Sequence, residues 1–218
     1  MNDIALLDYL NEFISPERRD RFKKVLEQRT NFLTVAIEDV FQLHNTSAVI
    51  RSCEVFGVQS AHVIEGRFGE RLDKNIAMGA QQWVDIHRYQ DSSSCIDHLR
   101  NKGYKIIATT PNKESCLLDD FVLKEKVALF FGTEKEGLSK MVMDQADGFL
   151  KIPMVGFTES LNISVSAAIL LQKLTNSLKH QNVEWELTAD EKFEKQLDWT
   201  KKSIKSIDEI LERYYAGN

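Results

Sequence analysis

The segment ESLNISVSAA, residues 159–168, leads into the apolar run AILLQKL and carries hydrogen-bonding side chains at every second position. Interpreted as a strand, this alternation gives one polar face and one apolar face, as a half-buried strand requires. Interpreted as a loop that enters a helix, the same Ser and Asn side chains satisfy the free amides of the helix start. A ligand can also be held at such a helix start. The surrounding sequence decides between these two interpretations.

Short β-type runs alternate with helical patterns from about residue 31 to residue 178. This alternation is typical of a mostly parallel sheet with helices on both faces, in which ligands bind beyond the carboxyl ends of the strands. The pattern therefore predicts an α/β fold. The expected strands are LTVAIE (33–38), AHVIE (61–65), WVDIHR (83–88), YKIIATT (104–110), VALFFG (127–132) and FLKIP (149–153). The expected helices are 45–56, 73–80, 92–101, 139–145 and 163–178.

The first 30 residues form a helical extension in this prediction. Apolar residues from Leu6 to Phe13 recur at helical spacing, and Ser15 followed by Pro16 is an N-cap with a proline at the first helical position. The second helix carries the densest positive cluster of the chain, RRDRFKK, residues 18–24. A solvated helix face is the simpler interpretation of such a cluster, and a nucleic-acid contact is the alternative.

The last forty residues, 179–218, change character again. Thr188 and Glu191 form a capping-box pattern, and a one-sided apolar stripe continues to Tyr214 among many Lys and Glu residues. This pattern predicts one long amphipathic helix that packs on the core or on a second subunit. The expected domains are thus residues 1–30, 31–178 and 179–218.

Composition sets the broad class. With 218 residues, 43% hydrophobic and 28% charged, the chain has the size of one soluble domain with short extensions. Cys53, Cys95 and Cys116 show no CxxC spacing, so we expect no zinc site or disulfide framework, and packing roles for all three. An acidic N-terminus and the lack of a long apolar run favour a soluble protein of the reducing cytoplasm. The net charge of -5 argues against nucleic-acid binding through the overall field but allows a local patch.

Three segments remain once the common signatures are excluded, since the chain has no GxGxxG after a strand, no Walker loop, no HExxH and no GxSxG. They are HNTSAVIRSCEVFGV (44–58), ALFFGTEKEGLS (128–139) and KIPMVGFTESLNISVSAA (151–168). Each segment alone is weak evidence for a functional site, because an Asn before a helix is usually a cap and a GxExxG sequence is often only a structural turn.

Together, in this order, the three segments resemble the motifs of the SpoU (TrmH) family of RNA ribose 2'-O-methyltransferases in the SPOUT superfamily. The resemblance covers about residues 31–175. It implies a C-terminal trefoil knot, S-adenosylmethionine as methyl donor, and a homodimer whose active site draws on both subunits. The short helical arms further resemble those of the family members that methylate the D-loop guanosine at tRNA position 18. This resemblance makes tRNA the expected partner. Periodicity alone indicates only the alternating sheet.

The resemblance also assigns roles to residues. The expected catalytic residues are Arg51, Asn45, Glu134, Ser160 and Asn162. The expected cofactor-binding residues are Thr109, Gly132, Ile152, Met154 and Leu161, with Gly132 and Gly156 allowing close backbone approach. The expected RNA-binding residues are Arg18, Arg19, Arg21, Lys23 and Lys24. The polar side chains of 159–168 then tie a loop together and cap the next helix.

Several alternatives stay open at this point. Arg51 is a poor base because a guanidinium is effectively always protonated, so we expect it to grip an RNA phosphate and orient the ribose. Asn45 and Glu134 either contact the substrate or hold Arg51 in place. The target could also be ribosomal RNA or another tRNA nucleotide, and a non-catalytic RNA-binding module is the remaining class.

Overall fold

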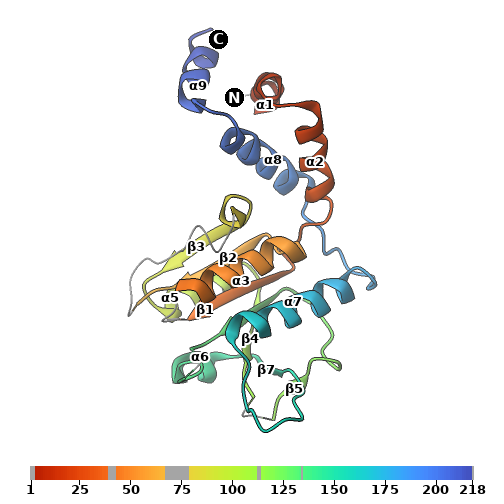
Figure 1. The fold of residues 1–218 in the computed structure, drawn as a ribbon, viewed down its shortest axis with the longest axis vertical. Helices are drawn as coiled ribbons and strands as arrows, with labels where there is room; N and C mark the ends of the chain where they lie inside the picture. Colours follow the sequence, from red (N-terminus) through yellow and green to blue (C-terminus); the bar gives the residue numbers. More distant parts are fainter. Residues whose placement is uncertain (1–2, 39–42, 67–78, 112–113, 134, 218) are drawn as a thin grey trace. The chain divides into compact units, whose positions relative to one another are not determined.

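The computed structural model describes residues 3–38, 43–66, 79–111, 114–133 and 135–217, and it divides the chain into two compact units. The larger unit spans residues 30–185, and the smaller unit combines residues 1–29 with residues 186–218. Figure 1 shows the helices and strands of both units. No helix among the described residues is long and apolar enough to cross a membrane.

A parallel sheet of seven strands forms the centre of the larger unit, in the order β3-β2-β1-β6-β4-β7-β5. In the middle of the sheet, Val35 of β1 pairs with Ala61 of β2 on one side and with Leu129 of β6 on the other. Central strands of this kind are buried on both faces, which explains why β1, β2 and β6 read as nearly continuous apolar runs. The strands are β1 (Leu33–Glu38), β2 (Ser60–Ile64), β3 (Asp85–Tyr89), β4 (Lys105–Thr109), β5 (Cys116–Leu117), β6 (Val127–Phe131) and β7 (Gly148–Lys151).

Helices cover both faces of the sheet. On one face, α3 (Leu43–Phe56) lies beside α7 (Ile163–Leu178), and both pack on a core that includes Val35 and Leu129. On the other face, α5 (Ser92–Asn101) and α6 (Lys140–Gln145) pack on Ala36 and Phe130. Figure 1 shows the α3 and α7 pair in front of the strands. The predicted α/β sheet with helices on both faces is confirmed.

The elements follow the predicted ranges closely. Strand β1 and helix α7 have the predicted bounds, and the other predicted strands differ by one or two residues at their ends. Strand β5 was not predicted, because two exposed residues carry no alternation. The helix predicted at 73–80 falls mostly outside the described residues, and a short 3₁₀ helix, η2 (Ala80–Gln82), begins where that range ends.

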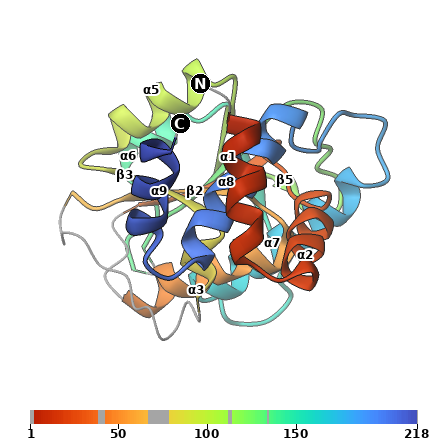
Figure 2. The same cartoon turned by 90° about the horizontal axis from the view of Figure 1, so that it is seen from above.

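The described part of the smaller unit contains four α-helices from the two ends of the chain, with the 3₁₀ helix η1 (Asn11–Phe13). The α-helices are α1 (Asp3–Leu10), α2 (Pro16–Leu26), α8 (Ala189–Ser203) and α9 (Ile207–Ala216). Leu6 and Leu10 of α1 pack on Ile210 of α9, and Phe22 of α2 meets Trp199 of α8 edge to face. Figure 2 shows these helices side by side. The N-terminal and C-terminal helices thus pack on one another through apolar side chains.

The helix caps of this unit were predicted correctly. The prediction of one continuous C-terminal helix was not correct. Ser15 accepts a hydrogen bond from the Arg18 amide, and Thr188 and Glu191 form the reciprocal capping box. The prediction of one long helix is wrong, because α8 ends before Ile204 and α9 begins after Ser206, which has a left-handed φ of 53°. The apolar stripe runs through this break, so periodicity does not reveal it.

Candidate functional site

The segment 159–168 is a loop that enters a helix, as the second interpretation predicted. No helix or strand covers residues 152–162, and α7 begins at Ile163. Asn162 is the N-cap, and its Oδ1 accepts hydrogen bonds from the amide of Ser164 at 2.9 Å and from the Ser164 hydroxyl at 2.6 Å. The polar residues therefore fix the loop and start the helix.

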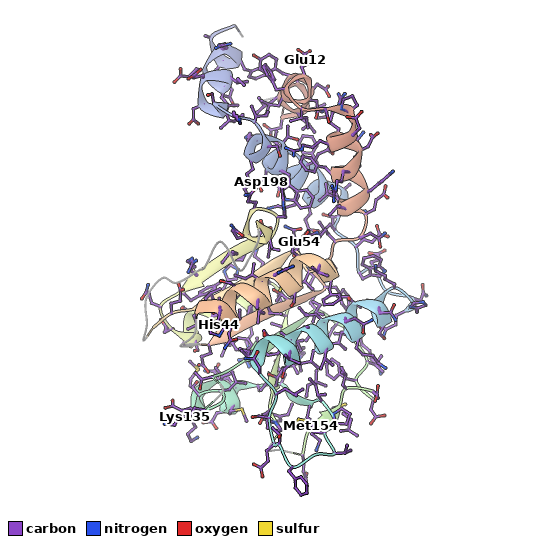
Figure 3. The ribbon with its side chains drawn as sticks, viewed as in Figure 1. Glu12, His44, Glu54, Lys135, Met154 and Asp198 are labelled. Carbon is purple, nitrogen blue, oxygen red and sulfur yellow. The ribbon has the colours of Figure 1, made fainter. Side chains whose placement is uncertain are left out.

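A cavity of about 470 Å³ opens at the carboxyl ends of β4, β6 and β7. We call it the strand-end cavity. Its walls come from the segments that follow these three strands and from the start of α7. Lys135 and Met154, labelled in Figure 3, lie on the segments after β6 and β7. The lining includes all five predicted cofactor-binding residues, Thr109, Gly132, Ile152, Met154 and Leu161, together with Ser160.

Gly132 stands where the backbone comes closest to itself. A Cβ atom added there would lie 2.2 Å from the carbonyl carbon of Gly137 and 2.3 Å from the Leu138 nitrogen. The turn between them is closed by two backbone hydrogen bonds, from Thr133 to Gly137 at 3.1 Å and from Gly137 to Thr133 at 3.0 Å. Only a glycine fits this wall. Gly156, by contrast, has open space around its Cβ position, so nothing in the described chain approaches it closely.

Charged side chains of both signs also line the strand-end cavity, beside its apolar residues. They are Lys135, Glu136, Lys151 and Glu159. These residues were not assigned a role from the sequence, although they lie inside the GTEKEG and KIP segments singled out there. A cavity of this size with apolar walls and a few convergent charges is the usual form of a small-molecule site.

Asn45 connects α3 to the start of α7. Its side chain is 1% exposed, and its Oδ1 accepts a hydrogen bond of 3.1 Å from Nδ2 of Asn162. The bond joins two predicted catalytic residues that are 117 positions apart in sequence. The bond goes to Asn162, so it tests neither the substrate contact nor the hold on Arg51 that was predicted for Asn45, and both stay predictions.

Arg51 lies six residues after Asn45, on the exposed side of α3. Its side chain makes no hydrogen bond or ion pair with another described residue, and Arg51 does not belong to the lining of the strand-end cavity. Glu134 lies outside the described residues. The structure thus brings together Asn45 and Asn162. Separately, it places Ser160 with the predicted cofactor-binding residues at the strand-end cavity. Arg51 lies exposed on α3, outside the cavity lining.

The cysteines differ in their surroundings. Cys53 and Cys95 are buried, as a packing role requires, but Cys116 is exposed on the edge strand β5, so the packing prediction is wrong for that residue. Burial raises the pKa of the Cys95 thiol, and the nearby Glu38 and Asp91 raise it further. A thiol held protonated is a poor nucleophile. No group of three or more His, Cys, Asp or Glu among the described residues could hold a metal ion.

A parallel sheet with a cavity at its carboxyl edge is the general architecture of ligand-binding α/β proteins, and the family match makes this class specific. Residues 32–172 match the SpoU rRNA methylase family, and the chain belongs to that family. It is 40% identical over 208 residues, 94% of this chain and 95% of the relative, to the tRNA (guanosine(18)-2'-O)-methyltransferase of Borreliella burgdorferi.

Solved structures agree with this assignment. The crystal structure of the A. aeolicus TrmH/SpoU tRNA modifying enzyme covers 87% of this chain and 98% of its own chain, with a TM-score of 0.77 and 27% identity. The SpoU methyltransferase AviRb from Streptomyces viridochromogenes, solved in complex with the cofactor AdoMet, matches with a TM-score of 0.61 and 20% identity. That match covers 72% of this chain and 65% of AviRb, and it shows the shared fold.

Proposed function

We propose that this chain transfers a methyl group from S-adenosylmethionine to the ribose 2'-hydroxyl of guanosine 18 in tRNA. The observation that carries the proposal is the 40% identity over 94% of the chain to a relative named for this reaction. The strand-end cavity, at the place where α/β sheets hold their ligands, supports it independently.

The cavity suits S-adenosylmethionine in chemistry. Ile152, Met154 and Leu161 give an apolar surface for the adenine, and the absence of a side chain at Gly132 opens backbone groups to the ligand. Charges of both signs in the lining match the amino and carboxylate groups of the methionine part. The bound cofactor would supply an electrophilic methyl group. Thr109, Gly132, Ile152, Met154 and Leu161 would hold it.

Arg51 has the central role toward the RNA in this proposal. Its exposed guanidinium can bind a phosphate with two hydrogen bonds and so orient the ribose for an in-line displacement. Positioning of this kind supplies a large share of the acceleration in a displacement reaction. The hydroxyl proton then leaves to that phosphate or to water, since the guanidinium itself stays protonated.

The other predicted catalytic residues divide into holding and contacting roles. Asn45 and Asn162 hold α3 against the start of α7, and thereby fix the helix that carries Arg51. Ser160, exposed at the strand-end cavity, contacts the ribose or the cofactor. For Glu134 we keep both alternatives, a substrate contact and a brace for Arg51.

The basic residues of α2 bind the tRNA backbone in this proposal. Arg18, Arg21, Lys23 and Lys24 are exposed and Arg19 is half-buried, so the helix offers a phosphate-binding surface without base specificity.

We propose residues 31–178 as the methyltransferase domain, with 1–30 and 179–218 as the extensions. The three free cysteines are consistent with the cytoplasm as the compartment.

We further propose a trefoil knot and a homodimer. The long segment between β7 and α7 is the part that family resemblance expects to be threaded. Val155 and Phe157 in this segment are fully exposed, and Val165 and Ile169 lie exposed one turn apart on α7. Exposed large apolar side chains in the loop and on α7 would be buried by a partner chain that packs on these two segments. Light scattering should give twice the 25.1 kDa of one chain, and a monomer would contradict the dimer.

A methyl-transfer assay tests the function. Purified full-length protein is incubated with labelled S-adenosylmethionine and either an unmodified tRNA transcript or a ribosomal RNA transcript. We expect label on the tRNA alone, mapped to the ribose of guanosine 18. Label on ribosomal RNA or on another tRNA nucleotide would support the same chemistry on a different target. No label on any RNA would favour the non-catalytic RNA-binding module.

A further inference from the structure

Glu38 is a buried carboxylate to which the sequence assigned no role. It is the last residue of β1, at the carboxyl edge of the sheet, and only 5% exposed. One oxygen, Oε2, accepts a hydrogen bond of 2.8 Å from the amide of Ser139, and Oε1 accepts one of 2.7 Å from the Ser139 hydroxyl. The hydroxyl of Ser92, at the start of α5, donates to Oε1 as well.

Ser139 is the end of the segment that forms one wall of the strand-end cavity. Gly132, Thr133, Gly137 and Leu138 of this segment all line the cavity. The segment begins at β6, which is fixed in the sheet, and ends at Ser139, whose hydroxyl also accepts from the Val142 amide at 3.3 Å. The wall is therefore held at one end by the sheet and at the other end by the contacts of Ser139.

The energetics favour a firm attachment at this second end. A buried carboxylate is costly unless hydrogen-bond donors satisfy it, and donors to a charged oxygen bind about twice as strongly as neutral pairs. The donors to Glu38 come from two segments, 101 and 54 positions away in sequence. The carboxylate thus connects the end of β1 to the starts of both α5 and α6.

We propose that Glu38 is a positioning residue, which holds the 132–139 segment in the shape that receives the cofactor. The cofactor part of this inference rests on the proposed function, and the part about the segment does not. Glu38 lies behind the wall and not among the lining residues, so it acts through Ser139.

Glu65 offers a matched control. It directly follows β2, the strand next to β1, at the same edge of the sheet, and its carboxylate pairs with Arg88 at 2.5 Å. Neither residue of this pair touches the strand-end cavity. Glu65→Gln therefore makes the same chemical change as Glu38→Gln at a neighbouring strand end without reaching the 132–139 segment.

The first test measures amide hydrogen exchange in the full chain without cofactor or RNA. Glu38→Gln keeps the side-chain length but puts an amide nitrogen, which cannot accept a hydrogen bond, in place of one oxygen. We expect exchange of the Gly137 and Ser139 amides to become about tenfold faster, as expected for losing one hydrogen bond to a charged group. Glu65→Gln should leave these amides unchanged. Equal effects of both variants, or no effect of Glu38→Gln, would overturn the proposal.

A mutant cycle with Ser139→Ala separates this contact from a general loss of stability. Ser139→Ala removes the hydroxyl and also the cap of α6, so its own effect is mixed. In the double variant with Glu38→Gln, the increase in the amide exchange rate should be clearly smaller than the product of the increases in the two single variants. The reason is that both changes remove the same hydrogen bond. An increase in the double variant equal to the product of the two single increases would count against a Glu38–Ser139 contact. If Glu38→Gln does not fold, Glu38→Asp takes its place in the cycle, because the shorter side chain keeps the charge but draws the carboxylate away from the Ser139 hydroxyl.

The second test is kinetic. Glu38→Gln should raise the KM for S-adenosylmethionine about tenfold with little change in kcat at saturating cofactor, because it weakens the site that binds the cofactor and leaves the RNA side intact. A fall in kcat with an unchanged KM would contradict the positioning role. A wild-type chain that transfers no methyl would defeat the proposed function alone, since the exchange experiment would still decide what Glu38 holds.

Discussion

Gly132→Ala is the substitution for which the structure gives the clearest magnitude. The new Cβ would lie 2.2 Å from the Gly137 carbonyl carbon and oxygen, and these are backbone atoms that cannot rotate away. Overpacking of this kind costs about 1–3 kcal/mol. Opening the turn would also weaken the two Thr133–Gly137 hydrogen bonds, each contributing about 1 kcal/mol. We therefore expect a loss of about 2–4 kcal/mol in the free energy of unfolding, or roughly 5–15 °C in Tm for a domain of this size.

The assay pairs thermal unfolding with calorimetric titration of S-adenosylmethionine, and Gly156→Ala is the control. Gly156 lies in the same site region, but its Cβ position has nothing within 4 Å, so this variant should unfold within about 1 °C of wild type. Gly132→Ala should in addition bind the cofactor at least about tenfold more weakly, because the turn is a wall of the strand-end cavity. Equal Tm values for the two variants would refute the argument from backbone contact.

Three further predictions concern Arg51, α2 and His62. Arg51→Lys should lower kcat about 10- to 100-fold with unchanged cofactor affinity, since lysine keeps the charge and loses the bidentate fork; unchanged turnover would refute the phosphate grip. Changing Arg18 and Arg21 to Glu should weaken tRNA binding. The slope of log binding constant against log salt concentration should become less steep by roughly 0.7–0.9 per lost phosphate contact. The affinity for the cofactor, measured by calorimetry, should not change. Burial, with His87 and His98 nearby, lowers the pKa of His62 to about 3, so the neutral ring is the folded form. Unfolding then takes up a proton below pH about 6.5, so the free energy of unfolding should fall by about 1.4 kcal/mol per pH unit towards pH 3. In urea titrations, His62→Phe should make this fall with pH less steep, and His180→Gln, at an exposed position, should not change it.

The strands and helices of the larger unit were predictable because burial on both faces leaves an apolar run that stops where the strand stops. Strand β1 and helix α7 show this most clearly, since LTVAIE and the residues after Asn162 change character at the observed ends. The order of strands in the sheet was not predictable from periodicity, which carries no information on which strands pair. The break at Ser206 escaped prediction for a related reason, because a left-handed φ leaves no trace in an apolar stripe.

The candidate site was predictable only where sequence motifs carry it. Thr109, Gly132 and Leu161 come from three separate segments, and resemblance to the family grouped them before the cavity did. Glu38 had no such signal, since one acidic residue at the end of an apolar strand is common, and its partner Ser139 is 101 positions away. Long-range hydrogen bonds of this kind depend on the sheet order, which the sequence pattern does not specify.

The most direct measurement compares two tRNAs that differ in one atom. One carries guanosine at position 18 and the other 2'-deoxyguanosine, and both are incubated with the full chain and labelled S-adenosylmethionine. We expect label on the first tRNA, recovered as 2'-O-methylguanosine from position 18, and none on the second. Equal labelling of both tRNAs, or label on a base, would contradict it.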